Sequence, residues 1–130
     1  STILLTGCSL QGSPLLMALE RTSEPSAALN LSDMYPDAEH IHISCTNNSK
    51  VLAEALGYDP LRFSHLRDDH KNWLIITNKD GSYDVETYNK FTIRFCEMSD
   101  TYTIREVTDE SLTFEKYNAV WLLAPAIGVS

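Results

Sequence analysis

The residues best suited to carry chemistry lie in two short stretches of this 130-residue chain. The first, Gly7 to Ser13, joins an apolar run to Ser13-Pro14, a pair typical of a helix start. Serine can cap the first helical turn, and proline lacks the N–H that is left unpaired there. Backbone N–H groups at such a turn can also hold an anion. Cys8 and Ser9 stand in this turn as candidate nucleophiles, and Cys8 is the best candidate for a reactive thiol because it precedes a predicted helix.

The second stretch contains His40 and His42, which are separated by one residue on a predicted strand, so both imidazoles leave the same face. In one interpretation, a histidine acts as the base for Ser9 or Cys8 in a compact hydrolase or lyase acting on a small molecule. Two histidines on one face can also bind a metal. No further residues stand at a spacing that would require them to complete a metal site. We therefore predict no metal and no cofactor.

Known nucleotide-binding motifs do not fit the Gly7–Ser13 turn. A phosphate-binding loop requires a lysine where Ser13 stands, and Pro14 follows it. A dinucleotide fingerprint requires three spaced glycines, whereas this turn has Gly7 and Gly12. The turn is therefore not expected to bind a nucleotide.

The stretch from Ile3 to Leu10, Ile-Leu-Leu-Thr-Gly-Cys-Ser-Leu, resembles the first block of the GDSL (SGNH) hydrolases. The resemblance implies that Ser9 is a nucleophile at the end of a strand, and Asp37-Ala38-Glu39-His40 is similar to the Asp-x-x-His block of that family. In this chain Cys8 replaces the aspartate of the motif, and the Asp-x-x-His block comes far earlier. The family also has a parallel sheet.

The charge balance favours a different class of function. Ten basic and eighteen acidic residues give a net charge of −8, which repels phosphate backbones and argues against nucleic-acid binding. Carboxylates and tyrosines recur along one predicted sheet surface, a composition suited to docking onto a basic protein. We therefore expect a small acidic binding protein of the inhibitor, immunity or phage accessory type. Its expected binding residues are Tyr83, Asp84, Glu86, Tyr88 and Tyr102.

The elements that position these residues centre on residues 72–107. Asp80-Gly81 is a strong hairpin signal between two runs of strand type, because glycine accepts a positive φ without steric cost. Two further alternating runs follow, so we predict an antiparallel meander. Its four expected strands are 73–77, 83–88, 91–96 and 102–107.

Helices are predicted mainly in the first half of the chain: from Ser13 to an end near Arg21–Ser23, at 48–57 and from Asp59 onward. Strands are predicted at 2–6 and 39–45. We expect residues 22–37 to be mostly loop, with a short ordered piece at 27–31. Residues 108–118 fit either a strand or a helical turn, and the last apolar run, 119–123, is expected to stop at Pro125.

This pattern predicts a single α+β domain over residues 1–130. One antiparallel sheet of about five or six strands would carry two or three short helices on one face. The expected core residues are Leu4, Leu16, Leu19, Ile43, Leu52, Leu56, Leu74, Ile76, Phe91, Ile93, Phe95, Ile104, Trp121 and Leu122.

Cysteine usage and hydropathy bear on the compartment. Cys8, Cys45 and Cys96 form an odd, widely spaced set, which favours three free thiols and a cytoplasmic chain. No apolar run approaches the ~18 residues of a membrane span, and no basic residues precede Ile3 as in a signal peptide. We therefore expect no membrane partner. The sequence leaves the oligomeric state open.

Overall fold

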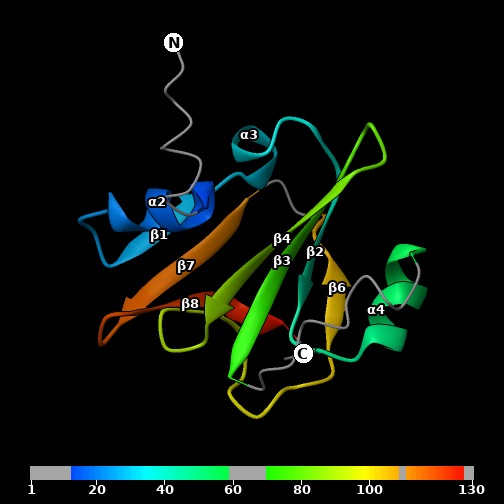
Figure 1. The fold of residues 1–130 in the computed structure, drawn as a ribbon. Helices are drawn as coiled ribbons and strands as arrows, with labels where there is room; N and C mark the ends of the chain where they lie inside the picture. Colours follow the sequence, from blue (N-terminus) through cyan, green and yellow to red (C-terminus); the bar gives the residue numbers. More distant parts are fainter. Residues whose placement is uncertain (1–12, 59–69, 109–110, 128–130) are drawn as a thin grey trace.

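The computed structural model describes residues 13–58, 70–108 and 111–127 (Figure 1). The expected strand at 2–6, most of the Gly7–Ser13 turn and the helix expected from Asp59 lie outside these residues. Within them, the predicted α+β class is confirmed: two four-stranded, mostly antiparallel sheets are combined with three short helices. No helix in the described part of the chain is long and apolar enough to cross a membrane.

The first sheet contains the predicted hairpin. Its strands, in spatial order, are β4 (Tyr83–Asn89), β3 (Lys71–Asn78), β2 (Ala38–Ser44) and β6 (Ile104–Glu106). All neighbours are antiparallel. The hairpin turn forms as expected, since Gly81 has a φ of 90° and the Asp80 carboxylate accepts a hydrogen bond of 2.9 Å from the Ser82 N–H. Hydrogen bonds from Ser82 lower the pKa of Asp80.

The second sheet is the part that the sequence pattern does not reveal. Its strands, in spatial order, are β1 (Ser26–Leu29), β7 (Leu112–Tyr117), β8 (Val120–Ile127) and β5 (Ile93–Cys96). β5 pairs parallel with β8 and not with β4, so the predicted meander is wrong beyond its first hairpin. β1 occupies the expected loop, residues 112–117 are a strand, and β8 continues through Pro125.

A buried asparagine joins the two sheets. Asn72, on β3, donates hydrogen bonds to the carbonyls of Tyr88 and Ile93, at 3.1 and 3.0 Å. It also accepts one of 2.8 Å from the Phe95 N–H. Because the Asn72 side chain is fully buried and all three partners are backbone groups, it fixes the place where β5 leaves the hairpin.

Two of the three described helices begin at the predicted caps, Ser13 and Asn48. Ser13 caps α2 (Pro14–Glu20) by accepting a hydrogen bond of 2.9 Å from the Leu16 N–H. Asn48 caps α4 (Ser49–Leu56), which ends at Gly57 with a φ of 79°. The third helix is α3 (Leu31–Met34). Leu52 of α4 packs with Trp73 and Ile75 on one face of the hairpin sheet, whereas α2 and α3 contribute to the main core.

The main core lies between the two sheets, and most of the expected core residues are buried there or in the smaller cluster around Leu52. Eight of them are buried: Leu19, Ile43, Leu52, Leu74, Ile76, Ile93, Phe95 and Trp121. Four are half-buried (Leu16, Leu56, Ile104 and Leu122), and Leu4 lies outside the described residues. The prediction for Phe91 is wrong, since its side chain is 56% exposed. Phe91 sits in the turn after β4, so the alternation of the next strand begins only at Ile93.

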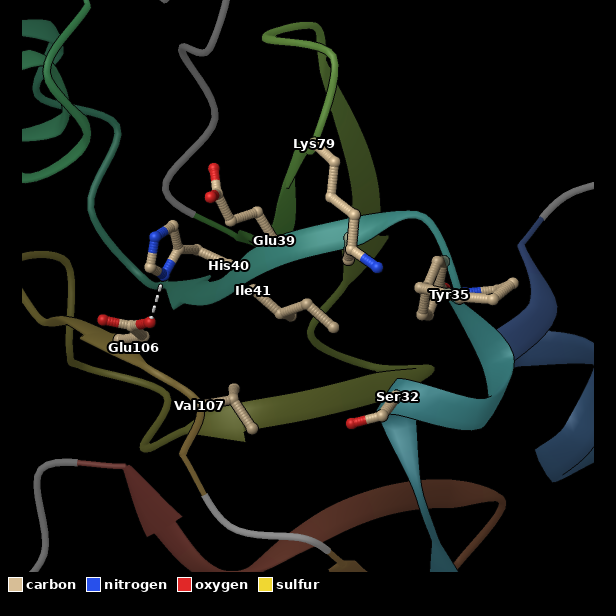
Figure 2. A pocket seen from close by; sticks show the side chains of 10 residues that line it. Ser32, Tyr35, Glu39, His40, Ile41, Lys79, Glu106 and Val107 are labelled. Atoms are coloured by element: carbon tan, nitrogen blue, oxygen red, sulfur yellow. Dashed lines mark hydrogen bonds and ion pairs between the residues drawn. The ribbon is translucent and has the colours of Figure 1, made fainter.

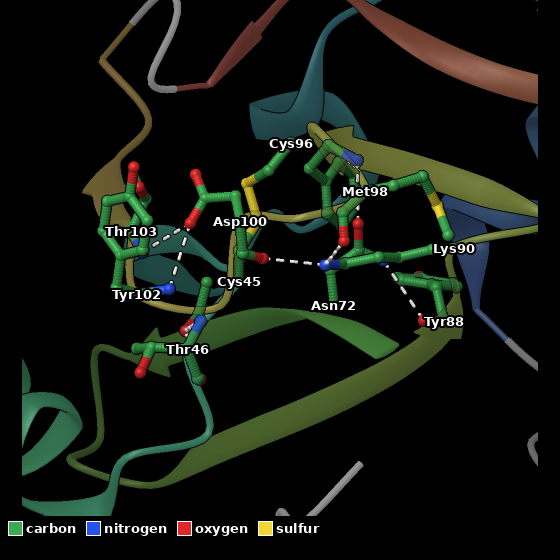
Figure 3. The surroundings of a disulfide bond; sticks show 12 residues. Cys45, Thr46, Asn72, Tyr88, Lys90, Cys96, Met98, Asp100, Tyr102 and Thr103 are labelled. Atoms are coloured by element: carbon green, nitrogen blue, oxygen red, sulfur yellow. Dashed lines mark hydrogen bonds between the residues drawn. A yellow bond between two sulfur atoms is a disulfide. The ribbon is translucent and has the colours of Figure 1, made fainter. Parts of the chain in front are cut away.

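The prediction of three free thiols is also wrong. Cys45 and Cys96 form a disulfide with a Cα–Cα distance of 6.4 Å (Figure 3). Cys45 directly follows β2 and Cys96 ends β5, so the bond ties one sheet to the other. A separation of 51 residues gives no sequence signal for this pairing, which only the two-sheet packing creates. The cytoplasmic expectation thereby loses its argument from free thiols.

The loop after the disulfide is held by buried polar groups. The Lys90 side chain is fully buried, and its amino group donates to the carbonyls of Met98 and Asp100 at 3.2 and 2.7 Å (Figure 3). The Asp100 carboxylate accepts hydrogen bonds of 3.0 Å from the N–H groups of Tyr102 and Thr103. These contacts give Lys90 a structural role.

Candidate binding site

The most distinctive surface feature is an acidic depression at the tip of the β3–β4 hairpin. Two adjoining hollows of about 330 and 190 Å³ share Asp37, Asn78 and Asp84 as lining residues. Asp80 and Lys79 line the larger hollow, and Glu86 and Tyr35 line the smaller one. We call this feature the acidic hollow and define it by its four carboxylate residues, Asp37, Asp80, Asp84 and Glu86.

The strand pairing explains why the carboxylates gather here. Asp84 pairs with Ile76 and Glu86 with Leu74, so both carboxylates leave the face of the sheet that carries core residues. Figure 1 shows the hairpin tip projecting away from β7 and β8. At one end of β4 this face is covered, and the Tyr88 side chain is only 5% exposed. At the hairpin end the same face is open to solvent, and Asp84 is exposed.

Two tyrosines hold Glu86 in place. The Tyr35 hydroxyl donates a hydrogen bond of 2.6 Å to Glu86 Oε1, and the Tyr88 hydroxyl donates one of 2.5 Å to the same oxygen. The Tyr88 hydroxyl is also hydrogen-bonded to the hydroxyl of Ser13, the residue that caps α2. The floor of the hollow is thus connected to α2, and Glu86 is fixed in orientation.

Burial keeps both tyrosines protonated. It is the largest cause that raises the pKa of Tyr35 and of Tyr88 far above the usual range, and the neighbouring Glu86 raises both further. Both hydroxyls consequently remain hydrogen-bond donors to Glu86 throughout the physiological pH range.

A backbone contact closes the other side of the hollow. The Lys79 N–H donates a hydrogen bond of 3.0 Å to the Asp37 carbonyl, which links the hairpin turn to the segment between α3 and β2. Tyr35, Asp37 and Lys79 were not among the expected site residues. The expectation of a loop over 22–37 gave no reason to place that segment against the hairpin.

The structure brings together some of the expected binding residues and separates others. Asp84 and Glu86 both line the acidic hollow. Tyr88 supports the hollow from beneath, and Tyr83 lies on the opposite face of the sheet against Tyr58, with ring centroids 5.0 Å apart. Tyr102 is 75% exposed in the loop before β6, away from the hairpin tip. The five residues therefore do not form one surface.

Both histidines lie on β2, and His40 lines a different depression of about 250 Å³ (Figure 2). His40 Nδ1 lies 2.6 Å from Glu106 Oε2, whereas the buried Nδ1 of His42 has no hydrogen-bond partner in the described part of the chain. Burial lowers the pKa of His42, Glu106 raises it, and His40 lowers it.

Ser9 and Cys8, the nucleophiles expected in the alternative interpretation, lie outside the described residues. Among residues 13–58, 70–108 and 111–127, no group of three or more metal-ligating side chains is arranged to hold a metal ion. The depression beside His40 is also lined by the apolar side chains of Ile41 and Val107 (Figure 2).

No protein-family model, curated protein or solved structure matches this chain.

Proposed function

We propose that this chain is a small acidic binding protein that docks onto a basic surface of a partner protein through the acidic hollow. It would act as an inhibitor, immunity or accessory protein, without catalysing a reaction. The observation that carries the proposal is the convergence of four carboxylate residues around one depression, from two segments far apart in sequence.

The hollow suits a cationic side chain better than a small neutral ligand. Asp37 and Asp84 are exposed, so their carboxylates can exchange water for a lysine or arginine of the partner. The Asp84 carboxylate also accepts a hydrogen bond of 3.2 Å from the Asn78 side chain. Glu86 is already oriented by Tyr35 and Tyr88, so little conformational entropy is lost when it meets a cation. Lys79 at the rim would be displaced toward solvent by the incoming cation.

The overall charge supports the same kind of partner. A net charge of −8 attracts basic surfaces over a distance set by ionic strength and opposes binding to nucleic acids. For the place of action, we propose an oxidising compartment instead of the cytoplasm. A buried disulfide is typical of exported proteins and rare in cytosolic ones.

The proposal is tested with a tetralysine peptide as probe. Asp37→Asn combined with Asp84→Asn should weaken binding at low ionic strength several-fold more than Glu24→Gln combined with Glu115→Gln. Both pairs remove the same charge from exposed residues, but only the first pair lines the hollow. Equal weakening in the two double variants would show that the probe senses net charge alone, and the proposal would fail.

A further inference from the structure

The sequence before the described domain contains a pattern that neither the fold nor the acidic hollow explains. An apolar run, Ile3-Leu4-Leu5, is followed by two small residues, Thr6 and Gly7, and then by Cys8. An apolar segment followed by small residues is typical of an export signal at its cleavage site. When a cysteine comes directly after the small residues, the pattern is that of bacterial lipid attachment. We propose that Cys8 is a lipid-modification site and that the mature chain begins there, anchored to a membrane surface.

The disulfide is an independent observation that points the same way. Cys45 and Cys96 are 2% and 0% exposed, and their bond crosses between the two sheets. Such a structural disulfide forms in an oxidising compartment, which a bacterial chain reaches by export. Of the three cysteines, the bond uses two and leaves Cys8. An odd thiol in an exported chain is prone to oxidation or cross-linking unless it is blocked, and a thioether to a lipid blocks it.

The modification consists of two balanced steps. In the first, the Cys8 thiol attacks the phosphate-bearing carbon of the diacylglyceryl unit of a phosphatidylglycerol-type phospholipid. An Sγ–C bond forms, the bond between that carbon and the phosphate oxygen breaks, and glycerol phosphate leaves with the thiol proton. In the second, water hydrolyses the Gly7–Cys8 peptide bond, giving a carboxylate on Gly7 and a free α-amino group on Cys8. Neither step requires an oxidant or a reductant.

The anchor would hold the domain close to the bilayer. Each buried CH₂ adds to the affinity for the bilayer, so two acyl chains bind stably where one binds only marginally. Four residues lie between Cys8 and Ser13, so the five residue steps from one to the other span at most roughly 18 Å in an extended chain. Ser13 caps α2 and is hydrogen-bonded to Tyr88 beneath the acidic hollow. The expectation of no membrane partner rested on hydropathy and on the lack of basic residues before Ile3. Hydropathy does not register a covalent lipid, and the basic residues of an export signal would precede residue 1 in the precursor.

The test uses the full precursor that the gene encodes, expressed in a bacterial host with one of the host's own lipoproteins as positive control. After trypsin digestion, mass spectrometry should find the peptide from Cys8 to Arg21 carrying a diacylglyceryl group. The intact protein should enter the detergent phase on cloud-point separation. Cys8→Ser should abolish both results while retaining the Cys45–Cys96 bond, and Gln11→Ala, outside the pattern, should change neither.

Three results would overturn the proposal while the host lipoprotein is processed normally. The first is a peptide in which the Gly7–Cys8 bond is intact and the Cys8 thiol is free. The second is a dimer cross-linked through Cys8. The third is recovery of the parent protein in the aqueous phase.

Discussion

The Tyr35 hydroxyl donates a hydrogen bond of 2.6 Å to Glu86 across a separation of 51 residues. This contact ties the segment between α3 and β2 to the hairpin and sets the shape of the acidic hollow. Glu86, which was expected to be a binding residue, therefore also has a structural role. Tests of binding should consequently change Asp37 and Asp84, whose substitution leaves the tyrosine–glutamate contacts intact.

Tyr35→Phe should lower the free energy of unfolding by about 1–3 kcal/mol, because the half-buried Glu86 loses one of its two tyrosine donors. Urea denaturation measures this change. Tyr117→Phe is the matched control, since that ring is 68% exposed, and its stability should equal that of the parent. A Tyr35→Phe protein as stable as the control would show that the contact does not hold the hollow together.

Reduction of the Cys45–Cys96 bond should also destabilise the protein. Opening a loop of 51 residues increases the entropy of the unfolded chain, which corresponds to about 4 kcal/mol in the chain-entropy treatment. Chemical denaturation with and without reductant measures the difference. In chain produced without lipid, a thiol titration under denaturing, non-reducing conditions should detect Cys8 alone. A count of all three cysteines would contradict the disulfide.

Ile93→Ala should cost roughly 2–5 kcal/mol, because a fully buried side chain is removed at the start of β5 and leaves a cavity. Phe91→Ala, two residues earlier, removes a larger side chain that is 56% exposed and should cost much less. Thermal melts of the two variants can be compared directly. The reverse order of stability would mean that the face assigned to β5 is incorrect.

Stability should fall as the pH drops below about 6.5, the usual pKa of an unfolded histidine. Burial lowers the pKa of His42 in the folded state, so the unfolded chain takes up a proton first and is favoured by acid. The stabilising contribution is present above pH 6.5 and decreases as the pH falls toward the lower, folded-state value. His42→Gln should remove this part of the pH dependence, measured by urea denaturation at several pH values. His70→Gln, at an exposed position, should leave it in place.

Local signals in the sequence were sufficient for much of the fold. Ser13 and Asn48 begin helices and Gly57 ends one, because capping depends on neighbouring residues. The Asp80-Gly81 turn was predictable for the same reason. β5 joins the second sheet because it pairs with β8 and because Asn72 holds its start. These contacts join residues far apart in the sequence, so no local pattern predicts them.

The candidate site was only partly predictable. Alternation along β4 placed Asp84 and Glu86 on one face, as the structure has them. The same alternation could not show that this face is the inner one, buried at Tyr88 and exposed only at the hairpin tip. Asp37 could not be foreseen beside Asp84, because their proximity depends on how the segment before β2 packs against the hairpin.

The most direct test of the proposed function is a nuclear magnetic resonance titration of the ¹⁵N-labelled protein with tetralysine. The spectra are recorded at low and at physiological ionic strength, where the Debye length falls from about 30 Å to about 8 Å. We predict that the largest shifts occur at Asp37, Lys79 and Asp84, and that they shrink at the higher ionic strength. Shifts spread evenly over all exposed acidic residues, including Glu24 and Glu115, would contradict a binding site at the acidic hollow.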